Sequence, residues 1–159
     1  MPQIRELSPD DWPLWREARL AALAEAPEAF GSKLSDWQGD GDTEEHWRAR
    51  LELAGSYNLI AMGDGVPVGM ASGIPGEEPD SAELISMWVA PEARGQQVGD
   101  ALVERVTAWA TAYGAGRLML SVKAGNDPAI RLYRRQGFGF VPGAEVDSDG
   151  ELPMVRPLR

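Results

Sequence analysis

An apolar strand in this sequence leads directly into an amphipathic helix through the turn APEARGQQVG. Residues 82–89 have the composition of a buried strand, and Val98 and Leu102 begin one face of the helix. A helix N-terminus presents unpaired backbone N–H groups and a partial positive charge, which together attract anions. Gly95 and Gly99 let the backbone approach a ligand without a Cβ in the way.

Arg94 adds a cation that can pair with phosphate oxygens at this junction. The turn has neither the Gly-Lys-Ser/Thr of a P-loop nor the GxGxxG of a dinucleotide fold. We interpret the junction as a site for a diphosphate, with an ordinary tight connection as the alternative.

The remaining patterns predict a single domain over residues 1–159, with a mixed α/β sheet in the order β-α-α-β-β-β-α-β-α-β-β. The hairpin signal Gly63-Asp64-Gly65 separates two of the strands. The other expected elements are a strand at 3–7, a helix opening at 8–11, a helix from 42 or 43 to 53, a strand at 82–89, a helix at 98–113, a strand at 117–123, a helix from 127 to 137, and strands at 138–141 and 151–157.

Composition excludes several kinds of chemistry. The chain of 159 residues has no Cys, which removes disulfides, thiolate metal sites and a cysteine acyl-enzyme. Because it also has one His, His46, we expect no metal centre. No run is long enough for a membrane span, and the N-terminal residues do not resemble a signal peptide. We therefore expect a cytoplasmic protein with no membrane partner.

The net charge of −10 is unevenly distributed. Residues 1–80 hold 16 acidic and 6 basic side chains, whereas residues 81–159 hold 9 of each. A nucleic-acid partner needs a basic face, so we expect none. The asymmetry favours an anion bound by the second half and a cation by the first, although acidic residues also serve solubility alone.

Two ordered motifs resemble the GNAT superfamily of N-acetyltransferases. AELISMWVAPEARGQQVGDALVERV is similar to the acetyl-CoA motif of that family, and LSVKAGNDPAIRLYRRQGF is similar to its second hallmark. The matching residues of the second motif are Asn126, Ala129, Leu132, Tyr133, Gly137 and Phe138. The resemblance implies a GNAT-like fold with splayed central parallel strands, acetyl-CoA as co-substrate, and a possible homodimer.

Two residues depart from the pattern of the family. Gln97 stands where the phosphate loop has its middle Gly, so a side chain must point away from the diphosphate. Asp100 favours the helix terminus but repels phosphate unless it is turned outward.

The resemblance also implies which residues contact the cofactor. Backbone groups of Met87, Trp88 and Val89 would hold the pantetheine arm and stabilise the oxyanion. Asn126 would bond a cofactor amide, or merely cap the following helix. The full expected set is Met87, Trp88, Val89, Arg94, Gly95, Gln96, Gln97, Val98, Gly99, Asp100, Ala101, Asn126 and Ala129.

Tyr133 matches the general acid of the family, because a phenol is protonated at neutral pH. The alternative is a core aromatic.

Glu83 aligns with the general base of the histone-acetylating branch. By strand alternation Glu83 shares a face with Ile85, Met87 and Val89, which predicts partial desolvation and a raised pKa. A solvent-facing carboxylate, a β-bulge that changes the facing, and a water chain acting as base are the alternatives.

The resemblance also implies that the first two helices and their loop form one wall of the acceptor site. Phe30 and Trp37 lie in loop-like sequence and are the predicted acceptor contacts. The predicted function is transfer of acetyl from acetyl-CoA to a primary amine of a cationic small molecule or peptide. The alternative is a non-catalytic acyl-CoA-binding sensor or pseudoenzyme on the same fold.

Overall fold

The computed structural model describes residues 2–25 and 34–159 and has the expected order of elements. Short 3-10 turns lie at Pro9–Asp11, Leu34–Trp37, Gly39–Gly41 and Pro91–Ala93. The helices and strands are β1 (Gln3–Glu6), α1 (Trp12–Glu25), α2 (Glu44–Leu51), β2 (Tyr57–Gly63), β3 (Val66–Pro75), β4 (Ser81–Val89), α3 (Val98–Tyr113), β5 (Arg117–Lys123), α4 (Asp127–Arg135), β6 (Gly139–Phe140) and β7 (Glu151–Pro157).

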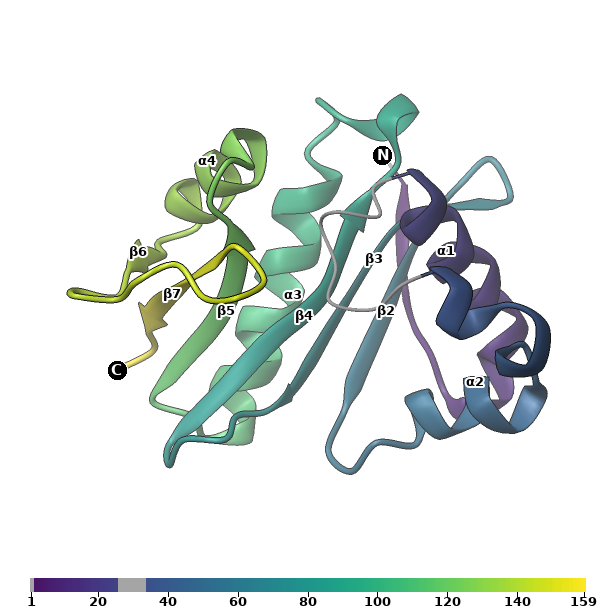
Figure 1. Cartoon of the computed structure of the whole chain (residues 1–159), viewed down its shortest axis with the longest axis horizontal. Helices are drawn as coiled ribbons and strands as arrows, with labels where there is room; N and C mark the ends of the chain where they lie inside the picture. The colour runs from purple at the N-terminus through teal and green to yellow at the C-terminus, as the bar shows by residue number, and fades with distance from the viewer. Residues whose placement is uncertain (1, 26–33) are drawn as a thin grey trace.

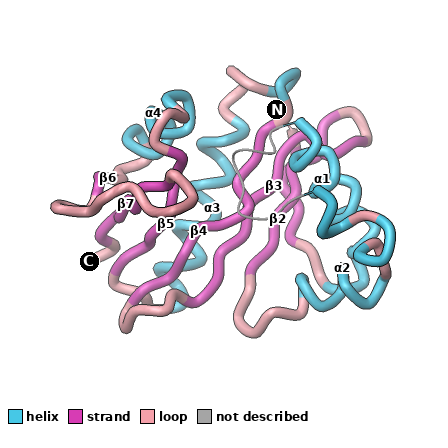
Figure 2. The backbone as a smooth tube through the Cα atoms, in the orientation of Figure 1, coloured by secondary structure: helices cyan, strands magenta, loops and turns pink. Residues whose placement is uncertain are grey.

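Within the described ranges the strands form one open sheet of seven, in the order β1-β2-β3-β4-β5-β7-β6 (Figures 1 and 2). β4 and β5 run parallel, and every other neighbouring pair is antiparallel. β4 and β5 pair over three positions, from Ser81↔Arg117 to Glu83↔Met119. Beyond those positions they diverge (Figure 1), which confirms the predicted splayed parallel strands.

Helices cover both faces of the sheet. A Cβ added to Gly73 of β3 would lie 2.5 Å from the Trp109 ring of α3, so this glycine allows α3 to approach the strand closely. The next residue back, Ser72, contacts Arg50 of α2. Adjacent strand residues point to opposite faces. We call the side of Gly73 the α3 face and the side of Ser72 the α1 face, because α1 and α2 pack together there (Figure 1).

A β-bulge in β4 corrects the predicted facing of that strand. Met70 pairs with Trp88, but Ser72 pairs with Ile85, so β4 has one residue more than β3 in this interval. The bulge includes Ser86, whose φ is +56°, in the left-handed region.

The extra residue reverses the alternation, and the prediction that Glu83 and Ile85 share a face with Met87 and Val89 was therefore wrong. Glu83, Ile85 and Trp88 point to the α1 face. Met87 and Val89 point to the α3 face, where both lie within 4 Å of a Cβ built on Gly99.

Asp42 connects the two helices of the α1 face. Its carboxylate accepts hydrogen bonds from Nε and Nη2 of Arg16, at 2.7 and 2.6 Å, and from Nε1 of Trp47, at 2.8 Å. The Arg16 contact first, and the Trp47 contact second, hold the pKa of Asp42 well below its usual value. Asp42 therefore fixes α2 relative to α1.

We predict that Asp42→Asn lowers the melting temperature at pH 7, because it removes the ion pair and one acceptor. A carboxyl whose pKa is lower in the folded than in the unfolded state stabilises the fold fully above the unfolded pKa, near ~3.9; this stabilisation declines below that pH and is lost as the pH falls through the folded-state pKa. Thermal melts from pH 7 to pH 2 should therefore show the two proteins converging below about pH 4.

Asp40→Asn is the matched control, because this carboxylate is exposed and lies two residues away. An equal loss at pH 7 from both variants would contradict the assigned role of Asp42.

Candidate active site

A cavity of about 1560 Å³ lies between the diverging ends of β4 and β5. The N-terminal turn of α3 and the first turns of α4 complete its wall. Of the residues predicted to contact the cofactor, the lining includes Met87, Trp88, Val89, Arg94, Gly95, Gln97, Val98, Gly99, Asp100, Asn126 and Ala129; Tyr133 lines it as well. The fold thus brings the two sequence motifs to one cavity.

The N-terminus of α3 has free hydrogen-bonding capacity. Gln97 is the N-cap residue and its side chain makes no capping bond to the helix. The first N–H bonded inside the helix is that of Ala101, to the carbonyl of Gln97 at 3.1 Å, which leaves the preceding amides for another partner. A Cβ on Gly99 would lie 3.0 Å from Leu132, so larger residues would crowd this turn. The turn therefore fits a phosphate group.

Gln97 has φ +64° and ψ +18°, the left-handed conformation that Gly adopts without strain. Gln97 thus has a conformation favourable to glycine, at the position where the resemblance places a glycine. A side chain at this position costs conformational energy, which is typical of functional loops.

Arg94, in the turn between β4 and α3, contacts the end of β4 and the end of α1. Its Nε donates to the carbonyl oxygen of Val89 at 3.2 Å, and its Nη2 lies 2.5 Å from Oε1 of Glu25 at the end of α1. An anionic ligand at this turn would share or replace the Glu25 contact. Glu25 also lines the cavity, and nothing in its local sequence marked it as a site residue.

Asp100 is neutralised by α4. Its carboxylate accepts from Nε and Nη2 of Arg135, at 3.1 and 3.0 Å, and from Nε2 of Gln136 at 2.9 Å. Arg135 is the largest cause of the lowered pKa of Asp100. The repulsion that this carboxylate would exert on phosphate is therefore offset by a paired cation.

Asn126 lies at the N-terminus of α4, and Tyr133 lies in the last turn of the same helix. The Oδ1 atom of Asn126 accepts from the N–H of Ala129 at 3.3 Å, so Asn126 does cap the helix while it lines the cavity. Tyr133 is 7% exposed and packs edge-on against Phe138, with ring centroids 6.0 Å apart. Burial raises the pKa of its phenol, which is therefore protonated at neutral pH.

Glu83 lies at the last paired position of β4 and β5, and it is not among the cavity-lining residues. It is partly exposed on the α1 face. Burial, followed by the nearby charges of Glu77 and Glu151, raises its pKa. The expected rise in pKa is present, although Met87 and Val89, two of the three apolar neighbours predicted as its cause, lie on the other face.

Three further predicted site residues lie outside the cavity lining, and a fourth is not described. Gln96 and Ala101 are not part of the lining, and the N–H of Ala101 is used inside the helix. Trp37 is 9% exposed and stacks on His46, with centroids 3.8 Å apart, so it packs within the α1–α2 region and does not line the cavity. Phe30 lies outside the described residues.

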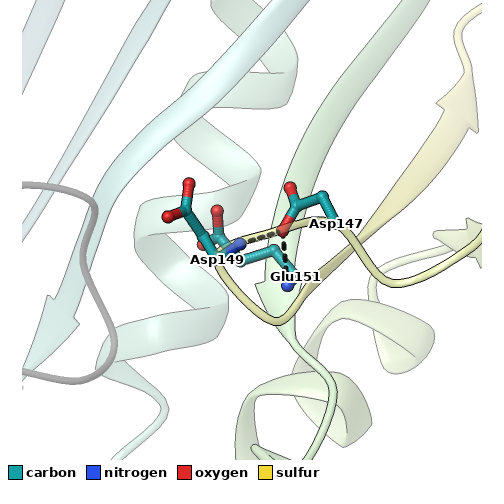
Figure 3. A group of neighbouring side chains, drawn as sticks. All are labelled: Asp147, Asp149 and Glu151. Atoms are coloured by element: carbon teal, nitrogen blue, oxygen red, sulfur yellow. Dashed lines mark hydrogen bonds between the residues drawn. The ribbon is translucent and has the colours of Figure 1, made fainter.

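A group of three carboxylates spans the turn before β7 and the first residue of that strand. Ligand atoms of Asp147, Asp149 and Glu151 lie within 4.8 Å of one another and could hold a metal ion (Figure 3). One oxygen of Asp147 already accepts from the N–H groups of the other two residues, both at 2.9 Å. The group is thus accounted for as a local turn, and the absence of a metal centre stays a prediction.

Comparison with known proteins identifies the family. The model of the acetyltransferase (GNAT) family matches residues 3–138. The chain therefore belongs to the acetyltransferase (GNAT) family.

Individual relatives agree with this assignment. Streptothricin acetyltransferase of Streptomyces lavendulae is 35% identical over 120 residues, which are 75% of this chain and 63% of that protein. The chain thus spans less than two thirds of the length of this curated relative. The crystal structure of nourseothricin acetyltransferase is 36% identical, with 67% of each chain covered and a TM-score of 0.60.

A third relative supports the fold alone. PaiA N-acetyltransferase from Thermoplasma acidophilum, solved in complex with coenzyme A, has a TM-score of 0.74 and 99% coverage of each chain at 18% identity.

Among the described helices, none has both the length and the apolar character needed to cross a bilayer.

We predict that Gln97→Gly raises the free energy of unfolding by about 1 kcal/mol, because glycine removes the strain of the left-handed conformation. Urea unfolding measures this change. Gln96→Gly is the control, because Gln96 is not among the residues with positive φ. At Gln96 the added backbone freedom should stabilise the unfolded chain and give no gain. Equal effects at both positions would show that strain at Gln97 is negligible.

Proposed function

We propose that this protein is an acetyl-CoA-dependent N-acetyltransferase that moves the acetyl group directly to a primary amine. The cavity between β4 and β5 carries this proposal, because it combines the open N-terminus of α3 with Tyr133 in one wall. Acetyl-CoA supplies the activated acetyl thioester. The amides of Val98 and Gly99, together with Arg94, would hold its diphosphate.

The reaction forms one C–N bond and breaks one C–S bond. The amine loses a proton, and the departing sulfur must be stabilised or protonated. Backbone groups of Met87, Trp88 and Val89 are the proposed contacts of the pantetheine arm and the oxyanion. Because the raised pKa of Tyr133 lies above the ~8.5 of an ordinary thiol, Tyr133 would act chiefly as a hydrogen-bond donor to the developing thiolate.

The acceptor follows less directly from the family, since its members are named after different compounds, such as streptothricin and mycothiol. The excess of carboxylates in residues 1–80 supports an acceptor with a positive charge. If so, transfer rates over an amine panel should rise with positive charge and fall with added salt.

The alternative function is an acyl-CoA sensor or pseudoenzyme on the same fold. In the sequence, the departures of Gln97 and Asp100 from the family pattern favour this non-catalytic alternative. The left-handed backbone of Gln97 and the Arg135 partner of Asp100 remove much of that support, because both residues are accommodated without closing the turn. A cytoplasmic location, a homodimer and the absence of nucleic-acid partners stay predictions.

The deciding experiment measures two quantities on the same protein: thermal stabilisation by coenzyme A, and thiol release from acetyl-CoA with an amine panel. We expect both in the wild type. Tyr133→Phe should lower turnover about a hundredfold, because it removes the donor, and leave stabilisation by coenzyme A nearly unchanged. Tyr113→Phe is the matched control, since this tyrosine is 52% exposed on the opposite end of α3.

Stabilisation without thiol release from any amine would favour the sensor. Unchanged turnover in Tyr133→Phe would remove this residue from the mechanism.

The pH profile tests Glu83 as general base. A base must be deprotonated, so activity should be lost as the pH falls through the raised pKa of Glu83, above the ~4.3 of a free Glu. Glu83→Gln should lower the rate at pH 7 and abolish this acid limb. Glu77→Gln should move the limb to lower pH, because it removes a repelling charge from Glu83. An unaltered profile in Glu83→Gln would leave the base to water.

A further inference from the structure

Arg50 of α2 is a partly buried cation whose hydrogen-bond partners among the described residues are neutral oxygens. Its Nη1 donates to Oδ1 of Asn58 at 3.0 Å, and its Nη2 donates to Oγ of Ser72 at 3.1 Å and Oγ of Ser86 at 3.2 Å. Within residues 2–25 and 34–159, no carboxylate forms an ion pair with it. Burial, and then the charge of Arg19, lowers the pKa of Arg50 to about 10, so the group is still charged at neutral pH.

Arg50, Trp15 and Trp88 have N–H donors to which the described residues supply no acceptor. A guanidinium has five N–H donors, and the three bonds above leave two of them. Arg50 also lies over the ring of Trp15, 4.9 Å from its centroid. The indole Nε1 atoms of Trp15 and Trp88 are buried, and neither has an acceptor among the described parts of the chain. Buried donors without acceptors are costly, and an anion would supply the missing acceptors.

This group of residues lies beside the point of transfer. Ser86, which Arg50 contacts, belongs to the bulge of β4 and directly precedes Met87, whose backbone is a proposed oxyanion contact. Trp88 points to the α1 face of the sheet, where Arg50 contacts Ser72, and it also lines the cavity. An amine that reaches the thioester from the α1 face would therefore pass close to this cation.

We propose that the Arg50 cluster, which consists of Arg50, Trp15, Ser86 and Trp88, binds a carboxylate of the acceptor. The acceptor is then an amino acid or an amino-acid-like amine, in which the carboxylate lies a few bonds from the reacting nitrogen. The inference rests on the proposed N-acetyltransferase function and narrows its substrate class. It also refines the expectation of a purely cationic acceptor, because the amine is drawn by the acidic half while its carboxylate pairs with Arg50.

A purely structural role would have Arg50 tie α2 to the sheet through Asn58 and Ser72. Such a role predicts that substitution lowers stability and slows all acceptors equally. The proposed role predicts a change in selectivity instead, which stability alone does not produce.

The test compares amino acids with their carboxamides as acceptors for acetyl-CoA. Because amidation also changes the pKa of the amine, kcat/KM is expressed per deprotonated amine. We expect the wild type to prefer the carboxylate by roughly tenfold to a hundredfold, the range of a charge-assisted hydrogen bond. Arg50→Gln should abolish this preference, and Arg50→Lys should keep part of it.

Arg48→Gln is the matched control, because Arg48 lies on the same helix and pairs with Glu44 and Asp10. It should leave the preference unchanged. If Arg50→Gln does not fold, wild-type inhibition decides: simple carboxylic acids without an amine should compete with the amine and not with acetyl-CoA.

Turnover with no carboxylate preference, or a preference that survives Arg50→Gln, would overturn this inference and leave the proposed function intact. Absence of thiol release with every amine, with or without a carboxylate, would instead overturn the proposed function.

Discussion

The short pairing between β4 and β5 is the constraint on which the site depends. Three paired positions, ending at Glu83↔Met119, hold the two parallel strands together at one end. Beyond them the strands separate, and the residues from Met87 to Val89 line a cavity together with the end of β5. Backbone groups that a continuous sheet would satisfy internally are thus available to a ligand. The two helices that begin at this end of the sheet, α3 and α4, complete the wall.

Two ion pairs line this cavity. Arg94 pairs with Glu25 of α1, and Asp100 pairs with Arg135 of α4. Each pair joins two elements that are distant in sequence and that meet at the mouth of the cavity. Arg50 differs from these arginines, since its described contacts are neutral and it lies on the α1 face of β4. The distinction separates Arg94 and Arg135, which pair with carboxylates beside the N-terminus of α3, from Arg50, whose described contacts are neutral.

Local sequence predicted the structure best where all residues of a feature, such as a turn or a helix cap, lie close together in the chain. The turn between β4 and α3, the Asn126 cap and Tyr133 of α4 each lie within a few residues of their own motif, so their geometry follows from local backbone rules. The facing of β4 did not follow, because one inserted residue at Ser86 changes which side chains share a face. Alternation alone cannot locate a bulge, since the extra residue is defined by the register with β3.

The sequence by itself determined the order of elements, the turn between β4 and α3, and the membership of the chain in one family. Those features depend on periodicity and on residues close together in the chain. The tertiary structure alone decided the side of the sheet on which Glu83 and Trp88 lie, the partner of Asp100, and the contacts of Arg50. Each of these depends on segments brought together by packing, which no local pattern encodes.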